Sequence, residues 1–367
     1  MKRTVLCLHQ SAELYGSDRS FLSTVQGIVE SNDVDIVLPF NGELYPLLEE
    51  CCGSVSVYSK GILRKKEVKK PLRYLKDTIL SVFHYVNEYK KYDIVYINTV
   101  VMLSALLAAV FFRFSSKKII CHVREIPSNK QILFFKAIFK LGNINLIYNS
   151  NATKHAFNLP GLVIYNGVED IGNNNIIERN TSGEEIRFLV IGRINTWKGQ
   201  QLFIDALYEY AKKSRHKISA RIVGSPFEGY EYLKDELEKR IVELGLQDTV
   251  SLIPFTNFPN EHYLWTDYIV VPSIKPEPFG RVVVEAFSAG KPAIAANHGG
   301  LSEIVINQHD GYLFQPNNKE DLISVFNKID ITHDEKYLIM STNARKNYEN
   351  KFSVRTYQDE IKKAIEE

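Results

Sequence analysis

Two carboxylates in the second half of the chain, Glu277 and Glu285, have types and spacing that fit a chemical role. Pro278 biases Glu277 toward an extended backbone, so we expect Glu277 to end a loop. A helix is predicted from near Gly280 to Gly290, where Gly-Lys-Pro is a strong helix stop. Small apolar residues surround Glu285, so this helix should be buried. An unpaired buried carboxylate is costly, and Glu285 therefore needs a partner.

Two interpretations of this pair stay open at this stage. In the first, both carboxylates bind hydroxyl groups of a ligand. In the second, Glu285 forms a structural salt bridge and Glu277 is solvated, because structural ion pairs also bury charge.

Cations and glycines follow other strands of the same half. Arg193 comes just after a strand, next to Gly192, and Lys198 precedes a helix. Two cations at the mouth of a sheet suit a diphosphate, because Arg binds it bidentately and Lys adds a mobile charge. The alternative is a pair of solvated loop charges. Gly224 ends another strand and permits close backbone approach to a ligand.

A glycine pair, Gly299 and Gly300, lies between a predicted strand and a helix. Backbone amides at such a helix start favour an anionic group when they are free. The pair would therefore contribute to an anion site if its amides are free.

The first half offers two candidate segments. Gly16 and Ser17 follow the first strand and let the backbone pass close to a ligand, although an ordinary capped turn reads the same way. His122, Arg124 and Glu125 stand together at the end of another strand. A lone histidine there is more often structural, but a cluster of three titratable groups favours a functional site.

The elements that position these residues alternate along the chain. Apolar runs of strand length are separated by helix-length segments, which include 19–30 and 103–112. This alternation predicts a parallel, doubly wound α/β sheet. The strands expected in the first half are 4–8, 35–38, 54–58, 94–97, 118–122, 146–149 and 162–165.

The alternation restarts after a polar stretch near residue 180. Two α/β domains are therefore expected, residues 1–175 and 184–351, with a ligand site in the cleft between them at the carboxyl ends of the strands. The strands expected in the second half are 186–191, 219–223, 250–253, 268–271 and 292–295, and the helices are 200–212, 230–244, 281–289 and 301–306.

Composition excludes several classes of function. The 367 residues carry a formal net charge of +2, so no strong field attracts nucleic acid. Four cysteines without a C-x-x-C pair favour a reduced cytoplasmic protein, and the longest apolar run, 101–112, is too short to span a membrane. No G-x-G-x-x-G, P-loop or zinc motif is present, which disfavours dinucleotide oxidoreductases, P-loop NTPases and zinc enzymes.

Taken together, these segments resemble the family 4 retaining glycosyltransferases, which have the glycosyltransferase-B fold of two Rossmann-like domains facing a central cleft. The resemblance covers nearly the whole chain, and its most specific element is the E-x7-E of Glu277 and Glu285. The other matching motifs are Gly16-Ser17, 122–125, 148–152, 164–168, Gly192-Arg193 with Lys198-Gly199, and Gly299-Gly300 with Glu303.

The resemblance implies a role for each donor-site residue. Arg193 and Lys198 hold the donor diphosphate and stabilise the leaving group, and Glu285 takes the ribose hydroxyls. Glu277 contacts hydroxyls of the transferred sugar. The turns at Gly192 and Gly224, and the backbone of Phe279, Gly280 and Arg281, lie near the sugar and phosphate. Arg281 stands where the family usually has an aliphatic residue.

The resemblance also assigns parts to the first domain. That domain binds the acceptor, His122 sits beside the reacting sugar, and the loop at Gly16 and Ser17 approaches donor and acceptor. The last segment, 352–367, resembles a helix that packs back on the first domain. The catalytic set implied is His122, Glu277, Arg193 and Lys198.

The function implied is transfer of a sugar, with retention at the anomeric carbon, from a UDP-sugar or, less favoured, a GDP-sugar. The acceptor expected is a glycan of bacterial surface polysaccharide, O-antigen or capsule. A cationic pair can replace a divalent metal at the leaving group, so we expect no metal requirement. The alternatives are a nucleotide-sugar epimerase or hydrolase of the same fold and a non-catalytic glycan-binding protein.

Two basic segments predict contact with a membrane. Residues 60–76 carry eight cations and one acid, and 130–140 interleaves aromatic and cationic residues. Such segments can dock on anionic bilayers. We therefore expect a peripheral protein at the inner face of the cytoplasmic membrane, with an acceptor linked to undecaprenyl diphosphate. The alternative is a solvated loop and a core-facing helix.

Overall fold

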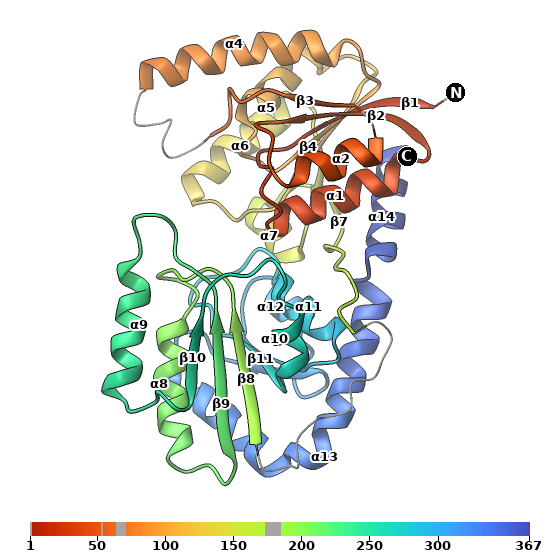
Figure 1. The fold of residues 1–367 in the computed structure, drawn as a ribbon. Coiled ribbons are helices and arrows are strands. Elements are labelled where there is room, and N and C mark those ends of the chain that lie inside the picture. The colour runs from red at the N-terminus through yellow and green to blue at the C-terminus, as the bar shows by residue number, and fades with distance from the viewer. Residues whose placement is uncertain (1, 53, 64–70, 173–184) are drawn as a thin grey trace. The chain divides into compact units, whose positions relative to one another are not determined.

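The computed structural model describes residues 2–52, 54–63, 71–172 and 185–367, apart from the side chains of 330–335. The chain divides into two compact units, Met1–Gly167 with Val354–Glu367, and Val168–Ser353 (Figure 1). The predicted boundary near residue 180 lies outside the described residues. The division itself falls earlier, between Gly167 and Val168.

The first unit contains a seven-stranded sheet in the order β3-β2-β1-β4-β5-β6-β7, in which neighbouring strands are parallel. Apolar residues alternate between its two faces, as period-2 strands require. The strands are β1 (Arg3–Leu8), β2 (Asn32–Leu38), β3 (Val55–Val57), β4 (Ile94–Asn98), β5 (Lys118–Val123), β6 (Asn145–Tyr148) and β7 (Leu162–Val163).

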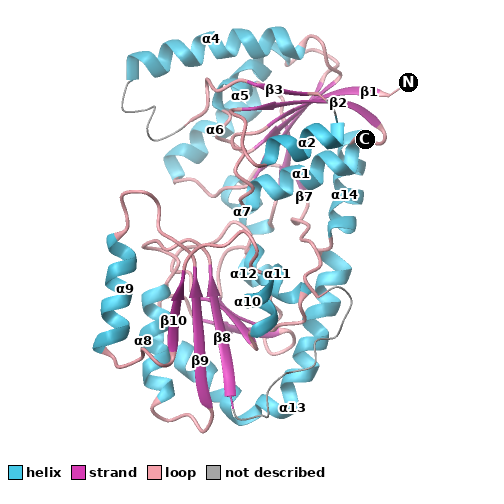
Figure 2. Cartoon of the chain, in the orientation of Figure 1, coloured by secondary structure: helices cyan, strands magenta, loops and turns pink. Residues whose placement is uncertain are grey.

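Helices cover both faces of this sheet (Figure 2). One face packs under α4 (Pro71–Tyr89), α5 (Leu103–Ala109), α6 (Asn129–Leu141) and α7 (Asn151–Phe157), with the short 3-10 helix η1 (Val110–Phe112). The other face packs under α1 (Gly16–Ile28), α2 (Leu44–Cys52) and α14 (Val354–Glu366). The C-terminal helix α14 is therefore part of the first unit, and its Tyr357 hydroxyl lies 2.6 Å from the Thr24 hydroxyl.

The second unit repeats the same winding with six parallel strands, in the order β10-β9-β8-β11-β12-β13. The strands are β8 (Glu185–Ile191), β9 (Lys217–Val223), β10 (Val250–Ile253), β11 (Tyr268–Val271), β12 (Ala293–Ala296) and β13 (Gly311–Phe314). The helices are α8 (Gln200–Ala211), α9 (Tyr232–Glu243), α10 (Asn260–Trp265), α11 (Arg281–Ser288), α12 (Leu301–Ile304) and α13 (Lys319–Lys351).

The predicted fold class is confirmed, since both sheets have the doubly wound strand order. In each sheet the order reverses beside the first strand, between β1 and β4 and between β8 and β11. Ligands of such sheets bind at the carboxyl ends of the strands at this point. Residues that follow β1, β4 and β5, or β8 and β11, are therefore the ones the fold brings to a site.

The sequence missed several elements. Strand β13 and helices α10 and α13 were not expected in the second half, and α2, α4 and α7 were not named in the first. The predicted strands were found within a few residues of their ends. Helix α13 has almost no segregation of apolar and polar residues along its 33 residues, so periodicity gave no helical pattern to detect. No described helix combines the length and apolar character that crossing a membrane requires.

Candidate functional site

An ion pair between Lys198 and Glu277 forms the centre of the second unit's site. The ammonium Nζ lies 2.8 Å from the carboxylate Oε1, and the side chains are 18% and 8% exposed. The Ser273 hydroxyl donates to the same oxygen. The interpretation of Glu277 as a solvated carboxylate is therefore wrong, because loop 273–277 folds it inward onto a cation 79 positions away in the sequence.

The turn after β8 is built to present Lys198. The Asn195 side-chain oxygen accepts from the backbone amides of Trp197, at 3.0 Å, and Lys198, at 2.9 Å. The Lys198 ammonium also lies 4.8 Å from the centre of the Trp197 ring. Gln200 donates to the Arg193 carbonyl and closes the turn. Local hydrogen bonds thus hold the loop of residues 193–200 at the carboxyl end of β8.

Arg193 lies in the same turn. Its guanidinium stacks over Phe227, 3.8 Å from the ring centre, in a cation–π contact. Gly192 and Gly224 have φ angles of 140° and 152°. A Cβ on Gly224 would lie 2.0 Å from the Gly192 carbonyl oxygen, so only glycine allows these two turns to touch. Gly192, Arg193 and Gly224 are thus one packed corner.

The glycine pair does not provide two free amides. The Gly300 amide donates to the Glu277 carbonyl at 2.8 Å, and a Cβ on Gly299 would lie 2.4 Å from that same oxygen. The pair therefore supports the backbone of loop 276–279 by close contact. The condition of a free amide is not met at Gly300, because its amide already donates to the Glu277 carbonyl.

Helix α11 positions Glu285, and the prediction that it is buried on all sides is wrong. Arg281, Val282 and Glu285 form a half-exposed stripe. Glu285 accepts from Tyr263 Oη at 2.5 Å and from Arg281 Nε at 2.8 Å. Burial, and then the Glu285 carboxylate, raise the pKa of Tyr263 well above its ordinary value, so the phenol stays protonated and donates.

The structural salt bridge considered for Glu285 is therefore present, with Arg281 as its partner. Arg281 and Glu285 are four residues apart on one helix, a spacing from which this ion pair could have been predicted. Gly280 begins the helix with φ at 122°, where a Cβ would lie 2.6 Å from Leu301. The Phe279 side chain is buried, 6.1 Å from the ring of Phe352.

The first unit gathers a second polar cluster around His122, which is fully buried. Its Nδ1 lies 2.6 Å from Tyr96 Oη and 3.3 Å from Arg124 Nη2. A guanidinium only donates, so Nδ1 accepts and the ring proton lies on Nε2. That Nε2 has no hydrogen-bond partner in the described part of the chain. Burial, and then the charge of Arg124, hold the pKa of His122 well below its ordinary value, so the imidazole is neutral.

Arg124 connects this histidine to its surroundings. The guanidinium donates to Asn98 Oδ1 at 2.6 Å, to Asn166 Oδ1 at 2.5 Å and to Tyr357 Oη at 3.0 Å. Arg124 itself is buried. The predicted cluster of His122, Arg124 and Glu125 is only partly formed, because Glu125 accepts from backbone amides, including that of Val100.

Sequence reasoning missed a buried pair, His9 and Asp18. His9 Nε2 lies 2.7 Å from Asp18 Oδ1, and neither side chain is exposed. His9 Nδ1 accepts from Asn98 Nδ2 at 2.8 Å, which extends the polar network from Arg124 to α1. The position of an acid at the start of a helix was the available sign. The remaining donors to Asp18 come from the first loop: the hydroxyls of Ser11 and Ser17 and the backbone amides of Glu13 and Tyr15.

This pair changes the interpretation of the first loop. The Ser17 hydroxyl donates to Asp18 at 3.0 Å, and α1 begins at Gly16, three residues before the helical segment 19–30 expected from the sequence. Hydrogen bonds to these carboxylate oxygens, above all from His9, hold the pKa of Asp18 below its ordinary value against the effect of burial. The charged Asp18 therefore anchors the loop of residues 11–15 to the first turn of α1, which carries Gly16 and Ser17.

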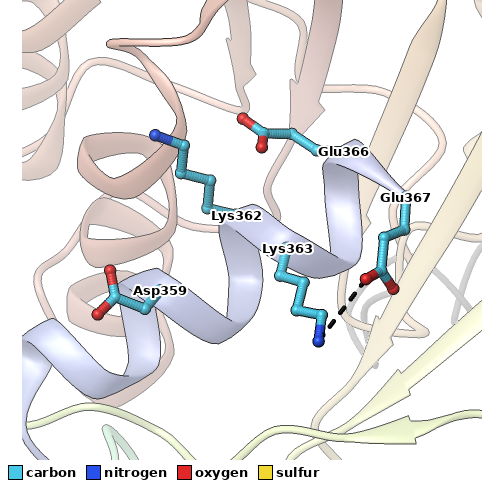
Figure 3. Close-up of a pocket in the computed structure, with 5 residues that line it drawn as sticks. All are labelled: Asp359, Lys362, Lys363, Glu366 and Glu367. Carbon is cyan, nitrogen blue, oxygen red and sulfur yellow. Dashed lines mark ion pairs between the residues drawn. The ribbon is translucent and has the colours of Figure 1, made fainter.

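The structure thus brings the predicted residues into separate groups. In the second unit, Lys198 and Glu277 form one group, the corner at Arg193 another, and Arg281 with Glu285 a third. In the described part of the chain, no three His, Cys, Asp or Glu side chains cluster as metal ligands would. A hollow beside α14 is lined only by the charged residues Asp359, Lys362, Lys363, Glu366 and Glu367, none of them a predicted site residue (Figure 3).

Parts of the sequence are similar to known glycosyltransferases. Residues 173–347 match the sequence family described as glycosyl transferases group 1. An uncharacterized glycosyltransferase of Methanocaldococcus jannaschii is 31% identical over 172 residues, 44% of this chain and 42% of that protein. The lipopolysaccharide 1,2-N-acetylglucosaminetransferase of Salmonella typhimurium is 30% identical over 145 residues, 38% of each. The chain thus spans about two fifths of the length of these relatives.

The whole fold has counterparts among solved structures. Anabaena HepE, crystallised in complex with UDP, is similar over 100% of both chains, with a TM-score of 0.80 and 24% sequence identity. HepE was also crystallised with UDP-glucose. The chain therefore has the glycosyltransferase-B fold, and its residues 173–347 are similar to group 1 glycosyl transferases.

Proposed function

We propose that this protein is a retaining glycosyltransferase that moves a sugar from a UDP-sugar to a glycan acceptor. The observation that carries the proposal is the half-buried Lys198–Glu277 pair at the carboxyl ends of β8 and β11, with Arg193 in the adjoining turn. The similarity of residues 173–347 to glycosyl transferases supports the reaction class. That HepE binds UDP supports a uridine nucleotide as the donor's leaving group.

This reaction requires positive charge near the departing diphosphate and protein groups that bind the hydroxyls of the sugar. An ammonium group has three donors, and Lys198 gives one to Glu277, so two are left for phosphate oxygens. Arg193 adds a bidentate donor for the same group. Fixed cations that meet charge as it develops are usually a large part of catalysis.

The carboxylates have separate tasks in this proposal. Lys198 and Ser273 both bind Oε1 of Glu277, and in the described part of the chain this leaves Oε2 for a sugar hydroxyl. Glu285 binds the ribose hydroxyls, for which it exchanges part of its pairing with Arg281. Because the cations neutralise the leaving group, the reaction needs no divalent metal. The acceptor is a lipid-linked glycan of bacterial surface polysaccharide.

The first experiment is ligand-dependent thermal unfolding of the full chain. A ligand that binds only the folded state stabilises it by mass action. We expect UDP and UDP-sugars to raise the unfolding temperature and GDP to do so less. A chain that responds to no nucleotide or nucleotide sugar would contradict the proposed donor class.

The second experiment is transfer itself. Purified protein, a UDP-sugar and a lipid-linked glycan acceptor are incubated with excess chelator, and the product is analysed by NMR. We expect a product whose anomeric configuration matches that of the donor. Inversion would refute retention, and loss of activity that magnesium restores would refute metal independence. Conversion of the donor without any acceptor would favour an epimerase or hydrolase.

A further inference from the structure

Helix α4 packs against the sheet with one side and exposes a set of apolar residues on the other. The side toward the sheet carries hydroxyl groups, and the residues buried there are Thr78, Ser81, Tyr85 and Tyr89. Tyr89 donates to the Ala105 carbonyl of α5 at 2.8 Å. A surface helix normally buries its apolar stripe and exposes its polar one. Val82 and Val86 also pack against the core from this side, so the inner contacts account for only part of the helix's apolar residues.

The exposed apolar residues lie on the outer side. They recur at the three- and four-residue spacing of one helical stripe. Their relative exposures are 84% for Leu72, 57% for Leu75, 49% for Ile79, 49% for Leu80 and 58% for Phe83. Single exposed apolar residues need no explanation, but a continuous stripe marks an interaction site.

Neighbouring elements of the same helical layer also carry exposed apolar residues. Helix α4 packs on α5, and α5 contacts α6 (Figure 1). Leu133 and Phe134 of α6 are 71% and 48% exposed. Phe111 of η1 and Phe114 just after it are 64% and 94% exposed. We call the outward residues of α4, η1 and α6, together with Phe114, the α4/α6 face.

The charge around this face is positive. Exposed cations stand among the apolar residues, with Lys76 on α4 and Lys130 and Lys140 on α6. The sequence of α6 contains no acid. On α4 the two acids, Asp77 and Glu88, are each paired with a cation, Arg73 at 3.6 Å and Lys91 at 2.8 Å.

Exposed apolar side chains together with exposed cations favour one kind of partner. A second copy of this face would set like charges against each other, which opposes self-association. An anionic lipid surface accepts both the apolar side chains and the cations. We propose that the α4/α6 face docks on an anionic bilayer, with the α4 stripe inserted at the boundary between headgroups and acyl chains.

This inference extends the proposed lipid-linked acceptor, but its test requires no enzymatic activity. The full chain is mixed with vesicles of phosphatidylcholine, alone or mixed with phosphatidylglycerol, and the bound fraction is measured by flotation. We expect binding to the mixed vesicles that weakens as salt is raised, because the cations act through screened charge. No binding to the mixed vesicles would overturn the proposal, whatever the activity assays show.

One variant removes the apolar stripe. Leu75→Gln with Ile79→Gln and Phe83→Gln should lower vesicle affinity at least about tenfold, because each side chain loses its burial in lipid. The matched control exchanges three exposed apolar residues of the second unit, Val242, Phe258 and Ile306, for Gln and should bind as the parent does. Retained binding by the stripe variant, with its fold checked by circular dichroism, would overturn the proposal.

A second variant removes the cations. Lys76→Gln with Lys130→Gln and Lys140→Gln should weaken binding to anionic vesicles by on the order of 100-fold, at about fivefold per cation. Exchange of Lys217, Lys234 and Lys239 of the second unit for Gln is the control. If the parent chain is instead a dimer in gel filtration that the stripe variant dissociates, the face is a protein interface and the bilayer proposal fails.

Discussion

The polar groups of the two units are organised in opposite ways. In the first unit, the network from Asp18 through His9, Asn98 and Arg124 to His122 is buried, and its members hydrogen-bond to one another and to neighbouring groups of the same unit. In the second unit, Lys198, Arg281 and Glu285 are paired yet keep between 16% and 18% of their side-chain surface. A closed network fixes a shape, whereas partly exposed pairs can exchange partners with a ligand. We infer that the first network positions residues and the second set binds.

The largest effect is expected for the partly exposed pair of Lys198 and Glu277 in the second unit. Lys198→Ala should lower sugar transfer by about 10²- to 10³-fold, the usual cost of removing one fixed group that stabilises transition-state charge. Steady-state transfer from a UDP-sugar measures it. Lys198→Arg is the control that keeps a cation. Transfer within a few-fold of the parent in Lys198→Ala would remove this residue from the proposed mechanism.

The next test contrasts the two units directly through two arginines. Arg124→Met should lower the free energy of unfolding by about 3 kcal/mol, because Asn98, Asn166 and Tyr357 lose a buried partner. Arg281→Met removes a half-exposed pair and should cost less than about 1 kcal/mol. Urea unfolding measures both. Equal losses of unfolding free energy in the two variants would contradict the distinction between the buried network of the first unit and the partly exposed pairs of the second.

A smaller effect is expected on the affinity for UDP, measured without a sugar or an acceptor. Glu285→Gln should weaken UDP binding about tenfold, because a neutral amide is a poorer acceptor for ribose hydroxyls than a carboxylate. Isothermal titration calorimetry with UDP measures this change. Glu236→Gln, at an exposed position of α9, is the control. Unchanged affinity in Glu285→Gln would mean that the pair with Arg281 is only structural.

The smallest effect concerns pH and the buried histidine. Because the folded-state pKa of His122 is depressed, the unfolded chain binds the extra proton below about pH 6.5, and stability is lost as pH falls. Between pH 7 and 6 this histidine should cost the fold about 0.7 kcal/mol. His122→Asn should show a correspondingly smaller loss in urea unfolding at the two pH values. Identical pH dependence in the two proteins would contradict a neutral, closed network.

Much of the fold was readable from local pattern. The alternation of apolar runs and helical segments indicated two doubly wound sheets. The same pattern placed Arg193 and His122 at strand ends and Lys198 before a helix. Strand propensity and the alternation of strands with helices depend on short stretches of sequence. The local pattern of apolar residues is therefore enough to predict them. Helix α13 has weak periodicity, and pattern alone does not detect such a segment. Helix α4 was not named, although its apolar residues recur at helical spacing.

Contacts between distant residues were decided only in three dimensions. Glu277 was open to interpretation as a solvated carboxylate until the fold placed it on Lys198, and His9 drew no notice until the sheet set it between Asp18 and Asn98. By itself the sequence determined which side chains stand at strand ends, because that depends on neighbours in the chain. Which of them pair, and which stay open to a ligand, depends on burial and distance, and only the tertiary structure fixes those.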